Sequence, residues 1–287
     1  MPELPEVEIV KRSLLNKVKN QKISKVNVYN RNLRFKVENE FEKFTKNQKI
    51  INVSRKSKYI IFHFTNQKYI VVHLGMSGTL HLLNKDGSNK FTNLSFYSSK
   101  FLPKNHNHIE FYFSKFKLVY NDPRRFGYFK LIKSKDELND FFKPFYPEAL
   151  DNKFNILYIK KKLKNKSKNI KNFLLDQNFV SGIGNIYASE ILYYCKINPK
   201  KKGGKLNLND MNNIVKFTKI ILKKAIRKGG STIRDFKNTK GLHGNYQKEF
   251  RVYNRTDLKC PRSKCIGFIK KIIINNRSTF YCHKCQK

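Results

Sequence analysis

The chain has 287 residues, and its 61 lysines and arginines far outnumber its 20 aspartates and glutamates, so its formal net charge is +41. Such an excess predicts a polyanionic partner, with nucleic acid favoured over an anionic membrane surface. Because the excess is mostly lysine, as in the products of AT-rich genes, it indicates a class of partner and not a site. No apolar run approaches the roughly 18 residues of a membrane span, and no signal-peptide pattern is present. We therefore expect a cytoplasmic, nucleoid-associated protein that is not secreted.

The first part of the chain predicts a helix followed by strands. Residues 5–18 carry apolar side chains at helical spacing, Pro5 suits the first helical position, and acidic residues fall in the first turn. The positive end of this helix points back toward Pro2. Runs of β-branched and aromatic residues at 49–64, 68–83, 109–113 and 118–132, separated by turn residues, then predict an all-β block.

The periodicity of the sequence changes after residue 134. Residues 135–142 predict a short helix, and the two prolines within residues 143–151 indicate a linker. Helical spacing then recurs at 154–164, 170–176, 186–196 and 208–228, so the next domain is mostly helical. The expected organisation is an N-terminal domain at 1–134, a linker at 135–151, a helical domain at 152–247 and a cysteine-containing segment at 248–287.

Pro2 and Glu3 form a candidate catalytic pair. Removal of Met1 leaves Pro2 with a secondary α-amine, which titrates near 8 rather than near 10.4 as a lysine does, so more of it is nucleophilic at neutral pH. Such an amine can attack the C1′ of a sugar and displace its base, and Glu3 can supply the acid. The alternative is that Pro2 and Pro5 only begin a helix.

Four cysteines near the C-terminus have the spacing of a metal site. Four residues separate Cys260 from Cys265, sixteen separate Cys265 from Cys282, and two separate Cys282 from Cys285. Two such knuckles joined by a hairpin predict tetrahedral thiolate ligation of one structural zinc ion, with no open position for catalysis. The alternative is four unligated thiols.

Basic and glycine-containing segments predict contacts with phosphates. The hairpin between the knuckles carries Lys270, Lys271 and Arg277, whose charges can neutralise a nucleic-acid backbone. Residues 180–187 place two glycines before a helix, where backbone amides and the side chain of Asn185 can converge on a phosphate. A Gly-x-Gly pattern alone is a weak signal, and the preceding helix argues against a dinucleotide site.

Two turns in the β region carry unusually bulky side chains. Residues 73–78 include Met76, and residues 122–127 include Arg124 and Phe126. Such side chains suit wedges that enter a base stack and pair with an orphaned base. The alternative is that both segments are ordinary turns with packed side chains.

Together these features resemble the bacterial formamidopyrimidine-DNA glycosylase family over nearly the whole chain. The motifs that carry the resemblance are residues 2–8, Lys58 before Tyr59, residues 73–78, 122–127, 175–177, 182–187 and 229–236, and the four cysteines. The resemblance implies an α+β multidomain fold that consists of an N-terminal β-sandwich with a leading helix, a helix-two-turn-helix domain and a C-terminal zinc β-hairpin, with DNA bound between the halves.

The resemblance also implies a function and a set of site residues. The expected activity is that of a monomeric DNA glycosylase and lyase, which removes oxidised purines through a Schiff base on Pro2 and cleaves the strand by elimination. Glu3 is then the acid and base, Glu6 a supporting residue, and Lys58 a phosphate contact that assists catalysis. The resemblance assigns DNA binding to His73, Met76, Arg124, Phe126, Lys171, Asn185 and Arg277, and zinc to Cys260, Cys265, Cys282 and Cys285. The loop after Gly230, including residues 239–246, would cover the extruded base.

The sequence departs from the family at its first knuckle, where four residues instead of the usual two separate the cysteines. Zinc knuckles tolerate two to four, so both cysteines remain expected ligands. Two other functions remain open from the sequence. One is an endonuclease VIII-like enzyme for oxidised pyrimidines, and the other is a non-catalytic zinc protein that binds nucleic acid, which leaves Pro2 and Glu3 unexplained.

Overall fold

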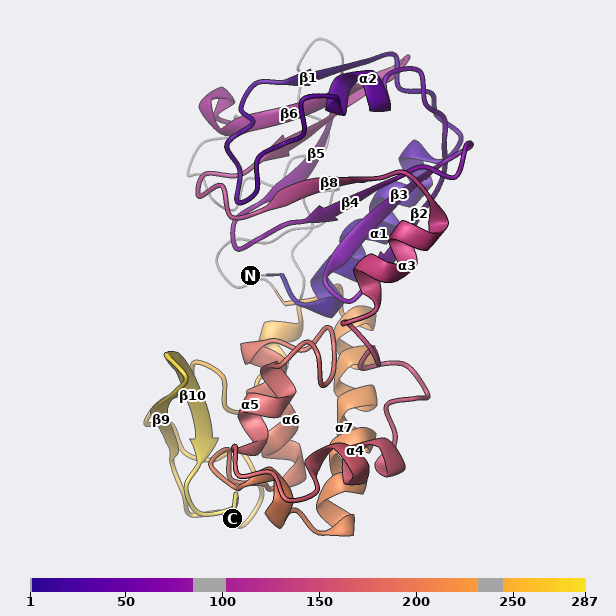
Figure 1. Ribbon diagram of the computed structural model, residues 1–287. Helices are drawn as coiled ribbons and strands as arrows, with labels where there is room; N and C mark the ends of the chain where they lie inside the picture. The colour runs from indigo at the N-terminus through magenta and orange to yellow at the C-terminus, as the bar shows by residue number, and fades with distance from the viewer. Residues whose placement is uncertain (1, 85–101, 232–244) are drawn as a thin grey trace. The chain divides into compact units, whose positions relative to one another are not determined.

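The computed structural model describes residues 2–84, 102–231 and 245–287. It consists of two compact units, which we call unit 1 and unit 2. Unit 1 comprises Met1–Phe142 with Lys228–Gln247, and unit 2 comprises Lys143–Arg227 with Lys248–Lys287. Figure 1 shows both units, which are described separately below. Within the described ranges, no helix combines the length and the apolar character that a membrane crossing requires.

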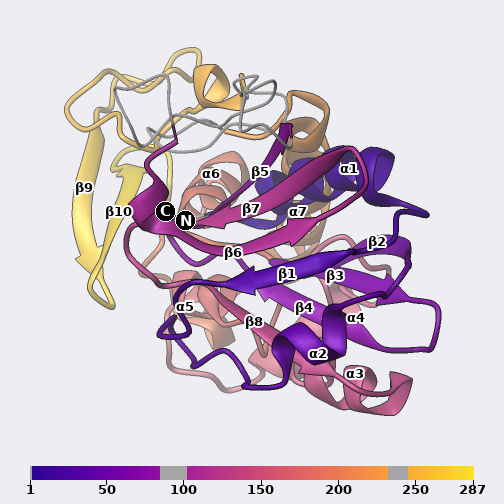
Figure 2. The same ribbon diagram turned by 90° about the horizontal axis from the view of Figure 1, so that it is seen from above.

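In its described residues, unit 1 contains two four-stranded antiparallel sheets and a leading helix. One sheet has the order β1-β6-β7-β5 and the other the order β2-β3-β4-β8. Figures 1 and 2 show the two sheets as separate layers. The elements are α1 (Leu4–Val18), β1 (Lys25–Val28), α2 (Phe41–Thr45), β2 (Ile50–Lys56), β3 (Tyr59–Phe64), β4 (Tyr69–His73), β5 (Thr79–Asn84), η1 (Lys104–His106), β6 (Asn107–Tyr112), β7 (Phe116–Asn121), β8 (Tyr128–Ile132) and α3 (Lys135–Phe142).

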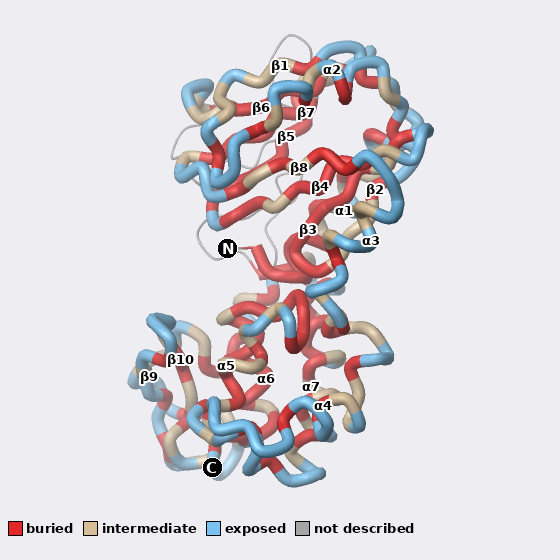
Figure 3. The backbone as a smooth tube through the Cα atoms, viewed as in Figure 1, coloured by how far each residue is buried: buried red, intermediate tan, exposed pale blue. Residues whose placement is uncertain are grey.

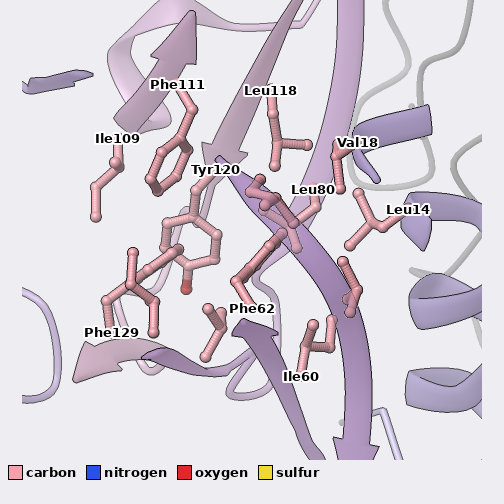
Figure 4. Packing of buried hydrophobic residues seen from close by; sticks show 14 of the residues in the cluster. Leu14, Val18, Ile60, Phe62, Leu80, Ile109, Phe111, Leu118, Tyr120 and Phe129 are labelled. Carbon is pink, nitrogen blue, oxygen red and sulfur yellow. The ribbon is translucent and has the colours of Figure 1, made fainter. Parts of the chain in front are cut away.

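The core of unit 1 lies between the two sheets and α1. Alternate residues of each strand point inward because side chains along a strand project to opposite faces, as Ile109 and Phe111 of β6 show. Figure 4 shows these side chains facing others from the opposite sheet, with Leu14 and Val18 of α1 closing one side. This burial fixes α1, whose first residues carry the candidate catalytic pair.

Unit 2 contains four α-helices and a two-stranded hairpin. Its elements are α4 (Ile156–Leu163), α5 (Ile170–Leu175), α6 (Asn185–Cys195), η2 (Gly203–Lys205), α7 (Leu208–Arg227), β9 (Ile269–Ile274) and β10 (Arg277–Cys282), while η3 (Tyr246–Glu249) lies at the boundary of the units. Helix α6 is almost fully buried, in contact with α5, α7 and β10 (Figure 3). The expected fold class, with a sandwich, a helical domain and a hairpin, is confirmed.

The structure refines several expected boundaries. Helix α1 begins at Leu4, one residue before the expected start, and the apolar runs at 49–64, 68–83 and 118–132 each divide into two strands at a loop. The compact units also differ from the expected segments in two places. Residues 228–247 belong with unit 1, and the cysteine-containing segment belongs with the helices of unit 2. The contacts that cause both differences involve buried carboxylates, described below.

Candidate functional site

The N-terminus of α1 is organised by two buried glutamates. Glu3 precedes the first helical residue, and its side chain accepts the backbone N–H of Glu6 in a capping box. In return, the backbone N–H of Glu3 donates to Glu6 Oε2 at 3.0 Å. Pro2 is buried, and Glu3 and Glu6 are each only 2% exposed. The start of the chain is therefore held in one conformation with a carboxyl group beside Pro2.

Glu6 also ties this helix terminus to a distant part of unit 1. Its Oε1 accepts the backbone N–H of Ser231 at 2.8 Å and the Ser231 hydroxyl at 2.9 Å. Gly230 has a φ of +78° and packs so closely that an added Cβ would lie 3.2 Å from Glu6 Oε1. These contacts explain why the segment after α7 belongs with unit 1. The following residues 232–244, including most of the expected base-covering loop, lie outside the described residues.

Lys58 lies in the tight turn between β2 and β3. The preceding residue, Ser57, has a φ of +55°, and its carbonyl accepts a hydrogen bond from Arg55 Nη1 at 2.8 Å. Arg55 Nε in turn donates to Glu8 Oε2 of α1 at 2.9 Å. Lys58 is 6% exposed. A chain of contacts from α1 therefore fixes the backbone immediately before Lys58.

Glu8 is the centre of this chain of contacts. Its other oxygen, Oε1, accepts from Arg12 at 2.8 Å and from Lys11 at 2.9 Å. Burial raises the pKa of the Glu8 carboxyl, but the hydrogen bonds from Arg12, Lys11 and Arg55 outweigh burial, so the pKa lies below its usual value. Glu8 therefore stays ionised at neutral pH and keeps Arg55 in place.

His73 lies at the end of β4 in a positively charged environment. Burial, with smaller contributions from the charges of Lys58 and Arg34, lowers the pKa of its imidazole to about 4. His73 Nδ1 accepts the backbone N–H of Gly75 at 3.1 Å, which assigns the proton of the neutral ring to Nε2. A neutral donor beside a lysine and an arginine can bind an anion such as a phosphate.

The two loops with bulky side chains lie against each other. A Cβ added to Gly75, which has a φ of +64°, would lie 2.4 Å from the backbone N of Gly127, so the loop backbones are in direct contact. Met76 and Phe126 are 43% and 40% exposed, and the Arg124 guanidinium lies 4.6 Å from the centre of the Phe126 ring. The sequence had indicated either wedges or packed turns, and the exposure of both side chains favours wedges.

The carboxylate of Asp122 accepts hydrogen bonds from both of these loops. Its carboxylate is fully buried and accepts the hydroxyl of Ser77 from the first loop. Within its own loop it accepts the backbone N–H of Gly127 at 2.9 Å, and from β7 the hydroxyl of Tyr120 at 2.9 Å. Hydrogen bonds to Asp122 therefore hold the two loops that carry the exposed Met76 and Phe126 side chains.

In unit 2, Asn185 is held at the first residue of α6. Its Oδ1 accepts from Lys171 Nζ at 2.7 Å, and its Nδ2 donates to the carbonyl of Ser278 at 2.8 Å. Lys171 is 0% exposed and donates also to Thr279 Oγ1 at 2.5 Å. The ammonium of Lys171 therefore joins the start of α6 to β10. Arg277, the first residue of β10, is exposed.

The four cysteines come together in unit 2. Their sulfur atoms all lie within 4.8 Å of one another, with Cys260 and Cys285 at 3.8 Å and Cys265 and Cys282 at 3.7 Å. A tetrahedron with about 2.3 Å from its centre to each sulfur has edges of about 3.8 Å. The cluster can therefore hold a metal ion of the size of zinc, despite the long first knuckle.

Several residues that organise the site were given no role by the sequence analysis. They are Glu8, Arg55, Asp122 and Ser231 in unit 1, and Gln177 and Glu190 in unit 2. Gln177 accepts the N–H of Gly182 at 2.9 Å, and Glu190 accepts three successive backbone N–H groups at Arg251, Val252 and Tyr253. Glu8, Asp122, Gln177 and Ser231 lie within motifs that carry the resemblance, and the Asp-Pro turn signal also pointed to Asp122. Arg55 and Glu190 carry no local signal, because their partners are distant in sequence.

Two protein-family models match ranges that together cover most of the chain. The family model described as the formamidopyrimidine-DNA glycosylase N-terminal domain matches residues 1–129. The model described as the H2TH domain of the same enzyme matches residues 145–237. A formamidopyrimidine-DNA glycosylase of Haemophilus influenzae is 40% identical over 288 residues, covering 100% of this chain and 99% of that protein.

Solved structures give the same result. A mutant of the Lactococcus lactis enzyme, in complex with DNA that contains Fapy-dG, is 33% identical with a TM-score of 0.87 and complete coverage of both chains. A complex of the Lactococcus lactis enzyme with DNA that contains an abasic site is 32% identical, also with a TM-score of 0.87 and complete coverage of both chains. In both structures, a protein of this fold is bound to damaged DNA.

Proposed function

Because the chain belongs to the formamidopyrimidine-DNA glycosylase family, we propose that it is a glycosylase and lyase of base excision repair that acts on oxidised purines in duplex DNA. The observation that carries this proposal is the buried pair of Pro2 and Glu3, held by Glu6 at the N-terminus of α1. The positive end of the helix favours the neutral, nucleophilic form of the Pro2 amine.

The proposed reaction begins when the Pro2 nitrogen attacks C1′ of the damaged nucleotide. The C1′–base bond breaks, and the base leaves with the proton that the amine gives up. Glu3 then protonates the ring oxygen O4′, the C1′–O4′ bond breaks, and the nitrogen and C1′ form an iminium on the opened sugar. The proton at C2′ is then acidic, and its removal expels the 3′ phosphate by β-elimination. Glu3 supplies and accepts protons at the sugar, and hydrolysis of the iminium returns the free amine.

The loops of unit 1 carry the side chains that bind the DNA around the lesion. We assign the phosphate beside the lesion to Lys58 and the neutral His73, which share one positive environment. Met76 and Phe126 fill the space left by the extruded nucleotide, and Arg124 binds the orphaned base. Extrusion costs a few kcal/mol, which these side chains offset in part.

Unit 2 supplies phosphate contacts and a metal-stabilised hairpin. Asn185 and Arg277 bind the backbone of the duplex, and the buried Lys171 orients Asn185 instead of meeting the DNA itself. Cys260, Cys265, Cys282 and Cys285 hold one structural zinc ion, which supplies cohesion to the hairpin and takes no part in the reaction.

The proposal is tested by base release and strand cleavage on duplexes that contain 8-oxoguanine, a formamidopyrimidine or an oxidised pyrimidine. We expect both purine lesions to be released faster than the pyrimidine, and Glu3→Gln to slow release about 100-fold or more. A preference for the pyrimidine would favour the endonuclease VIII-like alternative. Duplex binding without release of any of the three bases would favour the non-catalytic alternative.

A further inference from the structure

A cluster of exposed lysines in unit 2 is not used by the proposed reaction. They lie on two loop segments, one between α4 and α5 and the other between α6 and α7. We call this cluster the lysine platform, and it consists of Lys164, Lys166, Lys168, Lys200, Lys202 and Lys205, all of which are exposed. Figure 3 colours the chain between α4 and α5 almost entirely as exposed.

Backbone hydrogen bonds hold the two loop segments together. Gly203 N–H donates to the carbonyl of Lys168 at 2.9 Å, Gly204 N–H donates to the carbonyl of Lys166 at 2.9 Å, and Ile170 N–H donates to the carbonyl of Lys201 at 2.8 Å. A Cβ added to Gly204 would lie 3.0 Å from the backbone N of Lys166, so glycine permits this approach. The lysines of both segments are thereby fixed in one place.

The acidic residues of this part of the chain form no ion pair with a platform lysine. Between residues 152 and 210 the acidic residues are Asp176, Glu190 and Asp210. Glu190 is buried against backbone amides, and Asp210 pairs with Lys201, which is only partly exposed. None of the ion pairs found between described residues includes a platform lysine.

Fixing like charges together raises the free energy of the folded chain, and a polyanion relieves that repulsion. The lysines in the last turn of α4 and Lys164, its C-cap, have a local explanation, because cations stabilise the C-terminal end of a helix. The other five platform lysines lie beyond this helix end and lack the explanation. The second loop segment of the platform also lies away from the expected phosphate clamp. Asn185 is the first residue of α6, whereas Lys200 follows the last.

We propose that the lysine platform is a second binding surface for duplex DNA, which contacts phosphates independently of the lesion. We expect the lysines to contact phosphates and not base edges. Since phosphate contacts carry no sequence information, the binding is insensitive to the DNA sequence. The choice of duplex DNA as the polyanion rests on the proposed function. An enzyme that holds one duplex at the lesion site can then hold a second duplex segment at the platform.

The test uses protein joined covalently to a short 8-oxoguanine duplex by borohydride, so that the lesion site is already filled. This complex is titrated with a labelled undamaged duplex at about 100 mM salt. We expect binding that weakens with salt, and a loss of about tenfold or more in the variant K164Q/K166Q/K168Q/K200Q/K202Q. The same variant should release 8-oxoguanine from the short duplex at the rate of the unchanged protein, which shows that it is folded.

The matched control removes five exposed lysines from unit 1, in the variant K22Q/K36Q/K43Q/K46Q/K49Q. It changes the net charge equally and should bind the second duplex within about threefold of the unchanged protein. The proposal is overturned if the filled complex binds no second duplex, or if both variants lose affinity equally. Failure of the borohydride reaction would count against the proposed chemistry alone. The two variants would then be compared as free proteins on undamaged duplex, with the same expected difference.

Discussion

At the scale of single residues, buried carboxylates hold the candidate site in place. Glu6 joins the start of α1 to Ser231, Glu8 holds Arg55 beside the turn that carries Lys58, and Asp122 joins two loops. A carboxylate that accepts several hydrogen bonds is expensive to replace, because each abandoned donor is left buried. These residues hold the segments that carry the candidate site.

Asp122→Asn tests this arrangement at one residue. The amide of asparagine places an N–H₂ group where the carboxylate accepts donors from Ser77, Tyr120 and Gly127. We expect a loss of about 2–3 kcal/mol in the free energy of unfolding, measured with urea, and weaker binding of lesion duplex. The control, Asp140→Asn, changes an exposed aspartate and should cost less than about 0.5 kcal/mol. Equal effects of the two changes would contradict the role of Asp122.

The sequence indicated the residues that carry chemistry but not most of those that position them. Pro2, Lys58 and the cysteines belong to local motifs with recognisable spacing. The partner of Glu6, by contrast, lies 225 positions away, and only the folded chain brings it near. Lys171 illustrates the same limit, because the resemblance predicts a DNA contact but does not indicate that its ammonium donates to Asn185 and Thr279.

At the scale of elements, helix α6 joins the two functional parts of unit 2. Its first residue, Asn185, bonds to the start of β10, and Glu190 in its middle accepts the backbone of residues 251–253. The carbonyl of Tyr193 near its end accepts Arg262 from the first knuckle at 2.8 Å. The position of Arg277 therefore depends on the cohesion of the whole hairpin.

Removal of the metal should release this hairpin. We expect one zinc ion per chain by elemental analysis, and Cys282→Ala should lose both the zinc and about tenfold or more of the affinity for duplex DNA. Cys195→Ala is the matched control, because Cys195 is also buried but lies in α6 outside the cluster. Zinc-free protein, or a Cys282→Ala variant with unchanged DNA affinity, would contradict the zinc assignment.

Most helices could be predicted closely from periodicity, because their apolar residues recur at helical spacing. The expected helix at 135–142 matches α3, and that at 208–228 ends one residue beyond α7. Strand boundaries were harder, since the loops at residues 57–58, 74–78 and 122–127 interrupt runs that remain apolar on both sides. Those loops carry Lys58, Met76 and Phe126, so the exceptions to the pattern coincide with the candidate site.

At the scale of the whole molecule, the division into units depends on contacts between residues that are far apart in the sequence. The segment after α7 returns to unit 1 through Glu6, and the hairpin attaches to the helices through Glu190.

Buried and partly buried histidines make unit 1 sensitive to acid. Burial lowers the pKa values of His63, His73, His81 and His108, with His81 reaching about 3.

The stability of unit 1 should therefore fall in mild acid. A histidine whose pKa is lowered by folding contributes stability that is complete above its unfolded pKa near 6.5 and is lost as the pH falls toward the folded value. For His81, this loss is about 2 kcal/mol between pH 7 and pH 5. Urea unfolding at both pH values should show a smaller decrease for His81→Gln, and an unchanged decrease would refute the prediction.

Peptide mapping of the borohydride-trapped complex identifies the amine that attacks the sugar. We expect the sugar remnant on an N-terminal peptide that begins at Pro2, with Met1 absent. We also expect Pro2→Gly to lower the yield of adduct by about tenfold or more. An adduct on a lysine side chain, or a Pro2→Gly variant that is trapped at the full level, would rule out Pro2 as the nucleophile.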